Sequence, residues 1–203
     1  MSGARDTIEM WFDFASGYAY FGQLAVDRIE AETGCTVIWC PFMIGTAFKE
    51  TGAQALTATP MKAEYVRRDW PRLARLLGVP WAPPVSHPVI ALGASRIFYG
   101  LDERDAAQAT LFARAVFRRY YGNGEDITRD DVLVRCCEDA GASVDATRLA
   151  RDERLKQVLK DRSAEAMVRG VFGSPFFIWQ DEPFWGADRV DMLIDWVRSE
   201  RGA

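Results

Sequence analysis

Three absences in this sequence narrow the classes of function open to it. The chain has a single histidine, and its four cysteines form no C-x-x-C pair, so the usual zinc-ligand spacings are missing. Lysine and arginine total 25 against 29 aspartates and glutamates, which leaves no basic footprint for nucleic acid. No apolar run approaches the ~18 residues of a membrane helix, and the first residues lack the apolar centre of a signal peptide. We therefore expect no metal, no nucleic-acid partner and no membrane partner.

The rest of the composition is typical of a globular protein in water. Of the 203 residues, 49% are hydrophobic and 27% are charged, which is enough for one or two domains with a substantial core. The cysteines are Cys35, Cys40, Cys136 and Cys137. We interpret all four as reduced structural thiols, and we expect a cytoplasmic protein.

The two ends of the chain carry the strand signals. Residues 7–14 form a short aromatic-rich run, a helical stripe covers residues 18–34, and residues 36–40 form a second apolar run. This order predicts a parallel, right-handed βαβ unit. After Pro175, two apolar runs separated by turn residues predict a hairpin, and a last helix follows Asp188.

The middle of the chain has helical patterns and little strand character. One helix is expected over residues 61–77, where Pro71 predicts a kink. Further helices are expected from residue 89, from residue 106, after an N-cap at Thr128 and after an N-cap at Asp145.

These patterns divide the chain into two parts. Residues 6–55 and 165–203 together predict one domain with a four-stranded sheet and flanking helices. Residues 56–164 predict an all-helical insertion between the two halves of that domain.

The stretch Gly170–Ile178 lies where the second half begins. Pro175 precedes an apolar run and has no backbone donor, so it fits the first position of a strand. A Gly-Ser-Pro sequence also permits a cis bond before Pro175, which would turn the backbone groups of Ser174 toward a peptide-like ligand. An ordinary loop before a strand accounts for the same residues, and composition alone does not separate the two.

Four segments, in this order, carry a resemblance to a known family. They are Phe12–Tyr20, Phe42–Lys49, Gly170–Pro175 and Phe184–Arg189. In the same order, they are similar to four segments of the 2-hydroxychromene-2-carboxylate isomerases and kappa-class glutathione transferases. These are the D-F-x-S-P-Y-x-Y start, the loop after the second strand, the G-V-x-G-x-P motif and the F-W-G-x-D-R motif. The resemblance covers essentially the whole chain. It implies an α/β, thioredoxin-like fold of the DsbA type (βαβ plus ββα) with a large helical insertion, glutathione as cofactor, and a homodimer.

The resemblance implies a thiolate site around Ser16. This serine would stand where thioredoxins carry their nucleophilic cysteine, at a helix N-terminus, and its hydroxyl would stabilise the thiolate of bound glutathione. Ser174, followed by Pro175, would pair its backbone with the tripeptide. Ser16 fits the role of a simple N-cap equally well, and the two roles are compatible.

The resemblance also implies contacts for the two ends of glutathione. The helix start that contains Gly186, Asp188 and Arg189 would receive the γ-glutamyl end, with Asp188 binding its ammonium group. Lys49 would bind a carboxylate of glutathione or of the substrate. The ordinary alternatives are a helix cap for Asp188 and solvated surface positions for Arg189 and Lys49.

The residues implied to line the substrate site are Tyr18, Tyr20, Phe48, Gln54 and His87. The chain departs from the family's pattern on this side of the site. The proline after the serine is Gly17, which loosens the turn that aims Ser16, and Gln54 is the nearest substitute for an asparagine of the isomerases. The aromatic residue before Pro88 is replaced by His87, and the small polar residue after that proline is replaced by Val89. A solvated or locally satisfied loop histidine is the alternative for His87.

We predict an enzyme, a glutathione-dependent isomerase of the 2-hydroxychromene-2-carboxylate type. By resemblance, the bound thiolate adds to a conjugated, aromatic-derived acid, the adduct rotates, and elimination restores the thiol. A kappa-type transferase is the alternative within the family, and a non-catalytic module that binds glutathione or a protein is an alternative of another class. A thiol-disulfide oxidoreductase is disfavoured, because a serine at position 16 forms no disulfide.

Overall fold

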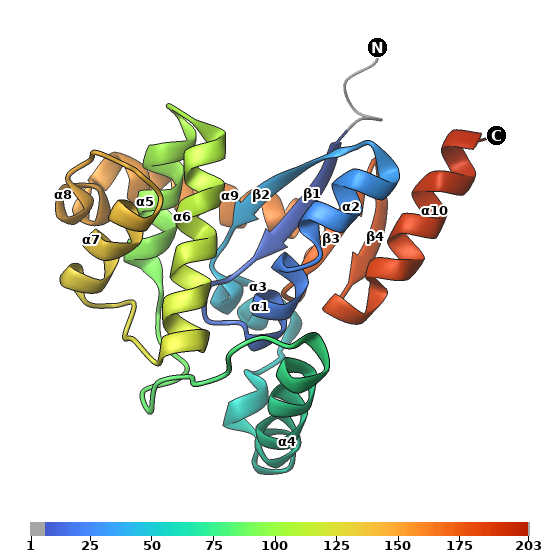
Figure 1. The fold of residues 1–203 in the computed structure, drawn as a ribbon, viewed down its shortest axis with the longest axis horizontal. Helices are drawn as coiled ribbons and strands as arrows, with labels where there is room; N and C mark the ends of the chain where they lie inside the picture. Colours follow the sequence, from blue (N-terminus) through green and yellow to red (C-terminus); the bar gives the residue numbers. More distant parts are fainter. Residues whose placement is uncertain (1–6, 203) are drawn as a thin grey trace.

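A four-stranded mixed sheet lies at the centre of the molecule (Figure 1). The computed structural model describes residues 7–202, so the predicted domain start at residue 6 lies outside the described residues. The strands are β1 (Thr7–Phe12), β2 (Thr36–Pro41), β3 (Phe176–Trp179) and β4 (Glu182–Trp185). Their order is β2-β1-β3-β4, with β1 parallel to β2 and antiparallel to β3, and β3 antiparallel to β4. The predicted βαβ and ββα halves are therefore confirmed.

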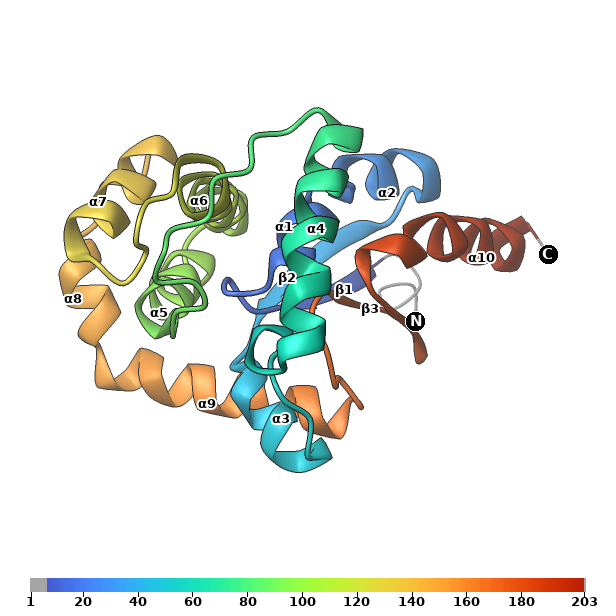
Figure 2. The same cartoon turned by 90° about the horizontal axis from the view of Figure 1, so that it is seen from below.

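Helices cover both faces of this sheet (Figure 2). On one face lie α1 (Gly17–Gln23), α2 (Val26–Thr33) and α10 (Val190–Gly202), and on the other lie α3 (Ile44–Thr51) and α9 (Glu153–Val168). Alternate side chains of β1 serve the two faces, since Met10 and Phe12 join one core cluster while Trp11 joins the other.

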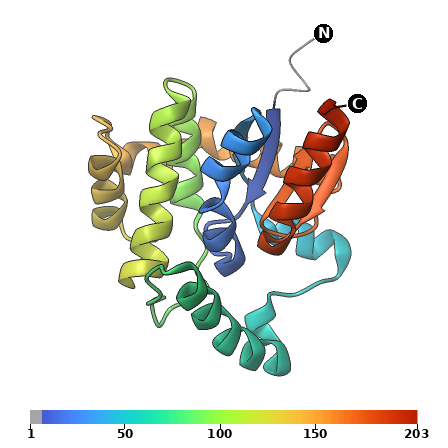
Figure 3. The same cartoon turned by 45° about the vertical axis from the view of Figure 1, so that its right-hand side comes forward.

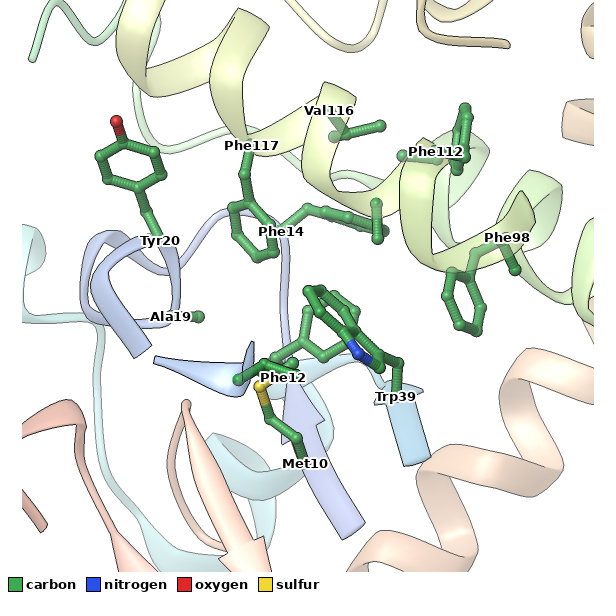
Figure 4. Close-up of a cluster of buried hydrophobic side chains, with 14 of the residues drawn as sticks. Met10, Phe12, Phe14, Ala19, Tyr20, Trp39, Phe98, Phe112, Val116 and Phe117 are labelled. Carbon is green, nitrogen blue, oxygen red and sulfur yellow. The ribbon is translucent and has the colours of Figure 1, made fainter. Parts of the chain in front are cut away.

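The helical insertion is joined to the sheet by a continuous aromatic core (Figure 4). Phe12 of β1 packs edge-on against Phe98, with ring centroids 6.3 Å apart, and also contacts Phe117 at 5.5 Å. Phe14 adds a second contact to Phe117 at 5.2 Å. Rings of this size, fully buried, are the largest apolar contributions a core can receive, so the insertion and the sheet form one packed body.

The remaining helices belong to the insertion. They are α4 (Pro60–Leu77), α5 (Leu92–Asp102), α6 (Ala106–Phe117), α7 (Asp130–Asp139) and α8 (Ala146–Arg151), with single turns η2 (Leu56–Ala58) and η3 (Arg118–Gly122). Figure 3 shows α4 set apart from the other insertion helices and lying beside α1. The predicted boundary after residue 164 falls inside α9, which packs on α3 and β2 as well as on α5. Among residues 7–202, every helix is too short or too polar to span a bilayer.

The helix predicted over residues 18–34 is broken in two. At its middle the backbone tightens, because Leu24 and Ala25 donate to the carbonyls three residues earlier, those of Phe21 and Gly22. Gly22 also packs directly on Pro175, where a Cβ atom would approach Pro175 Cγ to 2.7 Å. A contact made across the fold thus excludes a side chain in the last turn of α1.

Other predicted helix starts shift for identifiable reasons. Thr128 does not cap α7, because its hydroxyl donates to Asp126 at 2.7 Å and Arg129 occupies the cap position. The helix expected from residue 89 begins at Leu92. Asp145 caps α8 as predicted, accepting from the Arg148 N–H, and Pro71 lies inside an α4 that remains helical on both sides of it.

Gly17 is closely packed. A Cβ atom at this position would lie 2.7 Å from Cε2 of Trp70, whose side chain is only 7% exposed. Gly17 was expected to loosen the turn that carries Ser16. The indole ring of Trp70, from α4, packs against this turn and restricts it.

We predict that Gly17→Ala lowers the free energy of unfolding by about 1–3 kcal/mol, the usual cost of overpacking a buried position. Gly45→Ala, in the first turn of α3, is the matched control, because no atom outside its own helix lies within 4 Å of the added Cβ. We expect the control to be neutral or stabilising by up to ~1 kcal/mol. Urea unfolding of both variants measures the difference, and a Gly17→Ala protein as stable as the wild type would refute the packing argument.

Candidate functional site

Ser16 lies at the meeting point of α1 and the loop before β3. Its hydroxyl donates to the carbonyl oxygen of Ser174 at 2.8 Å and accepts from the N–H of Ala19 at 3.2 Å. The second contact makes Ser16 the N-cap of α1, as one of the two expected roles requires. The side chain is only half-buried, so a ligand can reach it.

Ser174 leaves one backbone group available. Its carbonyl accepts the Ser16 hydroxyl, and its own hydroxyl accepts from the N–H of Asp13 at 2.9 Å. Within residues 7–202, its N–H donates no hydrogen bond, although the residue is only 8% exposed. The bond between Ser174 and Pro175 is cis, and the Pro175 carbonyl accepts from Gly186 at 3.0 Å. A buried N–H without an acceptor is costly, and a peptide carbonyl of a ligand is a suitable partner.

Asp13 holds the surrounding segments together, and the sequence analysis missed it. One carboxylate oxygen accepts from the N–H of Ala15 at 2.8 Å, and the other accepts from the N–H of Ile44 at 3.0 Å. Its carbonyl accepts from the Ser16 N–H at 3.0 Å. Burial raises the pKa of this carboxyl group, while the two backbone hydrogen bonds oppose the rise. Asp13 is the aspartate of the Phe12–Tyr20 segment, so the family motif itself could have identified it.

Gly186, Asp188 and Arg189 form the entry to α10. Gly186 has φ of 109°, a conformation that favours glycine, and it precedes the single turn η4 (Ala187–Arg189). Asp188 therefore lies in η4 and does not cap α10 itself; its side chain is 75% exposed and 3.5 Å from the guanidinium of Arg189. Both residues border a shallow surface hollow of about 600 Å³ that continues along α10.

The predicted contacts on α3 lie at the surface. Lys49 is exposed in the last turn of that helix and forms no ion pair with any residue of the described range. Phe48 is half-buried, and Gln54 is exposed in the link to η2. Asp13 fixes the start of this helix, so the turn at Ser16 and the position of Lys49 depend on one carboxylate.

Two predicted substrate residues have their hydroxyl groups engaged elsewhere. Tyr18 donates to Asp69 of α4 at 2.8 Å, and its pKa is raised by burial and by the carboxylates of Asp69 and Asp188. Tyr20 is 3% exposed and donates to the carbonyl of Pro80 at 2.9 Å. Its ring belongs to the buried cluster drawn in Figure 4 and stacks on Tyr121, with ring centroids 5.2 Å apart.

His87 lies in the proline-rich loop between α4 and α5, packed among rings. Its Nδ1 is 2.9 Å from the hydroxyl of Tyr120, and its ring centroid is 5.4 Å from that of Trp70. Trp70 is the same residue that covers Gly17, so His87 is one indole ring away from the turn that carries Ser16. Burial lowers the pKa of His87 to about 4.

The cysteines take no part in this arrangement. All four are free and buried, as the sequence predicted. Burial raises the pKa of Cys136 and of Cys137 to about 12, and it also raises the pKa of Cys40. Thiols of this kind are poor nucleophiles, so the described residues hold no redox-active pair. Within the same range, no group of His, Cys, Asp or Glu side chains is arranged to hold a metal ion.

Comparisons with known proteins agree with this architecture. The chain is 29% identical to a 2-hydroxychromene-2-carboxylate isomerase of Sphingobium xenophagum over 94% of its length and 97% of that protein. It is 23% identical to glutathione S-transferase kappa 1 of Caenorhabditis elegans over 93% and 89% of the two chains. A solved 2-hydroxychromene-2-carboxylate isomerase superposes with a TM-score of 0.84 at 22% identity, covering 97% of this chain and 94% of that one.

The resemblance inferred from the four sequence segments is thereby confirmed. A family model described as a DSBA-like thioredoxin domain matches residues 7–197, which include both halves of the sheet and the helical insertion. The chain therefore belongs to the DSBA-like thioredoxin domain family.

Proposed function

We propose that this protein is a glutathione-dependent enzyme, and that its reaction is an isomerisation of a conjugated, aromatic-derived carboxylic acid. The observation that carries the proposal is the pairing of Ser16 with Ser174. The half-buried Ser16 hydroxyl lies 2.8 Å from the carbonyl oxygen of Ser174. The backbone N–H of Ser174 has no acceptor within the described chain. The sequence relatives, isomerases and kappa-class transferases by name, supply the chemical class.

The residues present fit a tripeptide with two carboxylates. Ser174 would pair its unused N–H with the peptide-like middle of glutathione, as an added strand does. Asp188 and Arg189 would hold the ammonium and carboxylate of the γ-glutamyl end, since they project opposite charges at an exposed helix entry. Lys49 would bind the glycyl carboxylate, because its ammonium group has no partner in the described chain.

Ser16 would stabilise negative charge on sulfur. When bound, glutathione supplies a nucleophilic thiolate. The Ser16 hydroxyl donates to the Ser174 carbonyl in the structure. Rotation about its Cβ–Oγ bond would turn the hydroxyl proton toward the sulfur of a glutathione bound beside it. Because α1 has only seven residues, we assign this stabilisation to the hydroxyl and to the first N–H groups of the turn, and not to a long helix dipole.

The substrate side rests on a different set of residues. Tyr18, Phe48, Gln54 and His87 would line the space next to Ser16, with Tyr20 supporting them from the core. A kappa-type transferase remains the alternative, since both activities appear among the relatives. The two are separated by the product: a transferase leaves the glutathionyl group on it, and an isomerase returns free glutathione. The homodimer and the cytoplasmic location stay predictions.

Calorimetric titration with glutathione tests the proposal as a whole. We expect saturable binding to the wild-type protein, and its absence would overturn the proposed function. Binding without turnover of any conjugated acid would instead favour the non-catalytic module.

We predict that Ser16→Ala raises the pKa of the bound glutathione thiol and lowers turnover strongly. The hydroxyl stabilises the thiolate, so its loss favours the protonated thiol, at about 1.36 kcal/mol for each pKa unit. Thiolate absorbance of the complex, followed against pH, measures the effect. Asp145→Ala is the control, because it also removes an N-cap, worth ~1 kcal/mol, but at α8. A Ser16→Ala complex that titrates like the control would rule out the thiolate role.

We predict that Asp188→Ala weakens glutathione binding about three- to tenfold, by loss of the contact to the ammonium group. The exposure of Asp188 limits the effect, since solvent screens the pair. Asp195→Ala, which borders the same hollow farther along α10, should bind glutathione normally. Calorimetry compares the two variants, and equal affinities would show that the γ-glutamyl end lies elsewhere.

A further inference from the structure

We propose that His87 is a hydrogen-bond donor to the substrate, offering its Nε2–H to a carbonyl or carboxylate oxygen of the conjugated acid. The proposal rests on the proposed function, because it assigns a partner to the substrate of that site. It adds a donor of defined tautomer at a position where the family's pattern has an aromatic residue.

The hydroxyl of Tyr120 sets the tautomer of the imidazole. The Tyr120 hydroxyl is buried, and its oxygen lies 2.9 Å from His87 Nδ1. Among the described residues this O–H has no other acceptor, so it donates to Nδ1, which is the acceptor. The ring proton is then on Nε2, which makes no hydrogen bond to any described residue.

The imidazole is neutral at physiological pH. Burial is the cause that lowers its pKa to about 4, and no charged side chain contributes to the shift. The titratable groups that face it are the phenols of Tyr120 and Tyr121, whose own pKa values are raised by burial. Neutral His87 therefore offers a single donor, and binding an oxygen does not require it to gain a proton.

Two neighbours of His87 carry donors that also lack an acceptor. Trp70 and Tyr121 contact the His87 ring, at centroid distances of 5.4 Å and 5.6 Å. The indole Nε1 of Trp70 and the hydroxyl of Tyr121 are buried and have no hydrogen-bond partner. Each unpaired buried donor costs about 1–3 kcal/mol. Unpaired N–H and O–H groups beside His87 are complementary to a ligand oxygen that bears negative charge.

The cluster is next to the turn that holds Ser16. Trp70 touches His87 on one side and occupies the space over Gly17 on the other. Tyr121 stacks on Tyr20 of α1, the helix that Ser16 caps, with ring centroids 5.2 Å apart. An aromatic acid whose reacting carbon faces Ser16 can therefore present its oxygen to His87. A fixed donor there stabilises the negative charge that develops on that oxygen during attack.

The single histidine of the chain makes a direct test possible. In protein labelled with 15N-histidine, NMR correlation of the ring nitrogens gives one set of signals, which reports the tautomer without mutation. We expect protonated Nε2 in the free protein. Titration with trans-cinnamate, an aromatic conjugated acid, in the presence of glutathione should shift the Nε2 signal saturably. A proton on Nδ1, or an Nε2 signal unmoved by saturating cinnamate, would overturn the proposal, as would cinnamate that does not bind.

Variants separate this role from a merely structural one. His87→Phe should weaken cinnamate binding about tenfold and glutathione binding not at all, while cinnamyl alcohol, which has no carboxylate, should bind both proteins alike. Tyr120→Phe should yield a mixture of tautomers in the same spectrum. Equal loss of cinnamate and cinnamyl alcohol would contradict the donor role. A protein that binds cinnamate at Nε2 but does not bind glutathione would overturn the proposed function and keep the donor.

Discussion

The carboxylate of Asp13 is the interaction on which the rest of the site depends. It joins the turn after β1 to the start of α3 through hydrogen bonds of 2.8 Å and 3.0 Å, while the main chain of the same residue binds Ser16 and Ser174. Three segments distant in sequence therefore meet on one half-buried residue. Its burial raises the carboxyl pKa, and protonation would forfeit an acceptor that the backbone needs. Asp13 therefore positions both the turn that carries Ser16 and the helix that carries Lys49.

The aromatic core supplies the second constraint. Phe12 and Phe14 lie at the end of β1 and interlock with Phe98 and Phe117 of the insertion, so the insertion cannot shift without opening a cavity. The same α6 helix continues into η3, which carries Tyr120. Packing at the end of the sheet therefore fixes the imidazole of His87 relative to Ser16, although the two residues lie on different layers of the molecule.

Sequence patterns predicted the elements that depend on local chemistry. The strand residues of β1 and β3 and the Asp145 cap follow from periodicity and backbone preference. The break after α1 was missed because residues 18–34 carry one helical stripe, whereas the N–H groups of Leu24 and Ala25 bond to carbonyls three residues back. Thr128 was misassigned because a nearby carboxylate competes for its hydroxyl.

The candidate site shows the same division. Ser16 and Ser174 come from motifs, and the structure brings their atoms within hydrogen-bond distance. Tyr18 was assigned to the substrate side, and its hydroxyl donates to Asp69, a partner on another helix that no local pattern indicates. Asp13 was overlooked for a similar reason, since a carboxylate next to a strand looks like any other until its acceptors are seen filled by Ala15 and Ile44.

Two departures from the family's pattern are physically linked. Gly17 has no side chain, and the indole of Trp70 fills the space that a side chain there would need. The same indole packs edge-on against His87, the second departure, at 5.4 Å. A proline at residue 17 would displace the indole of Trp70, which packs against His87. Substitutions at residues 17 and 87 are therefore expected to be coupled. Both altered residues contact Trp70 of α4, whereas the Ser16 hydroxyl bonds to Ser174 in the loop before β3. Physical coupling of this kind lets positions 17 and 87 depart from the family's pattern together, while the hydrogen bond between Ser16 and Ser174 is kept.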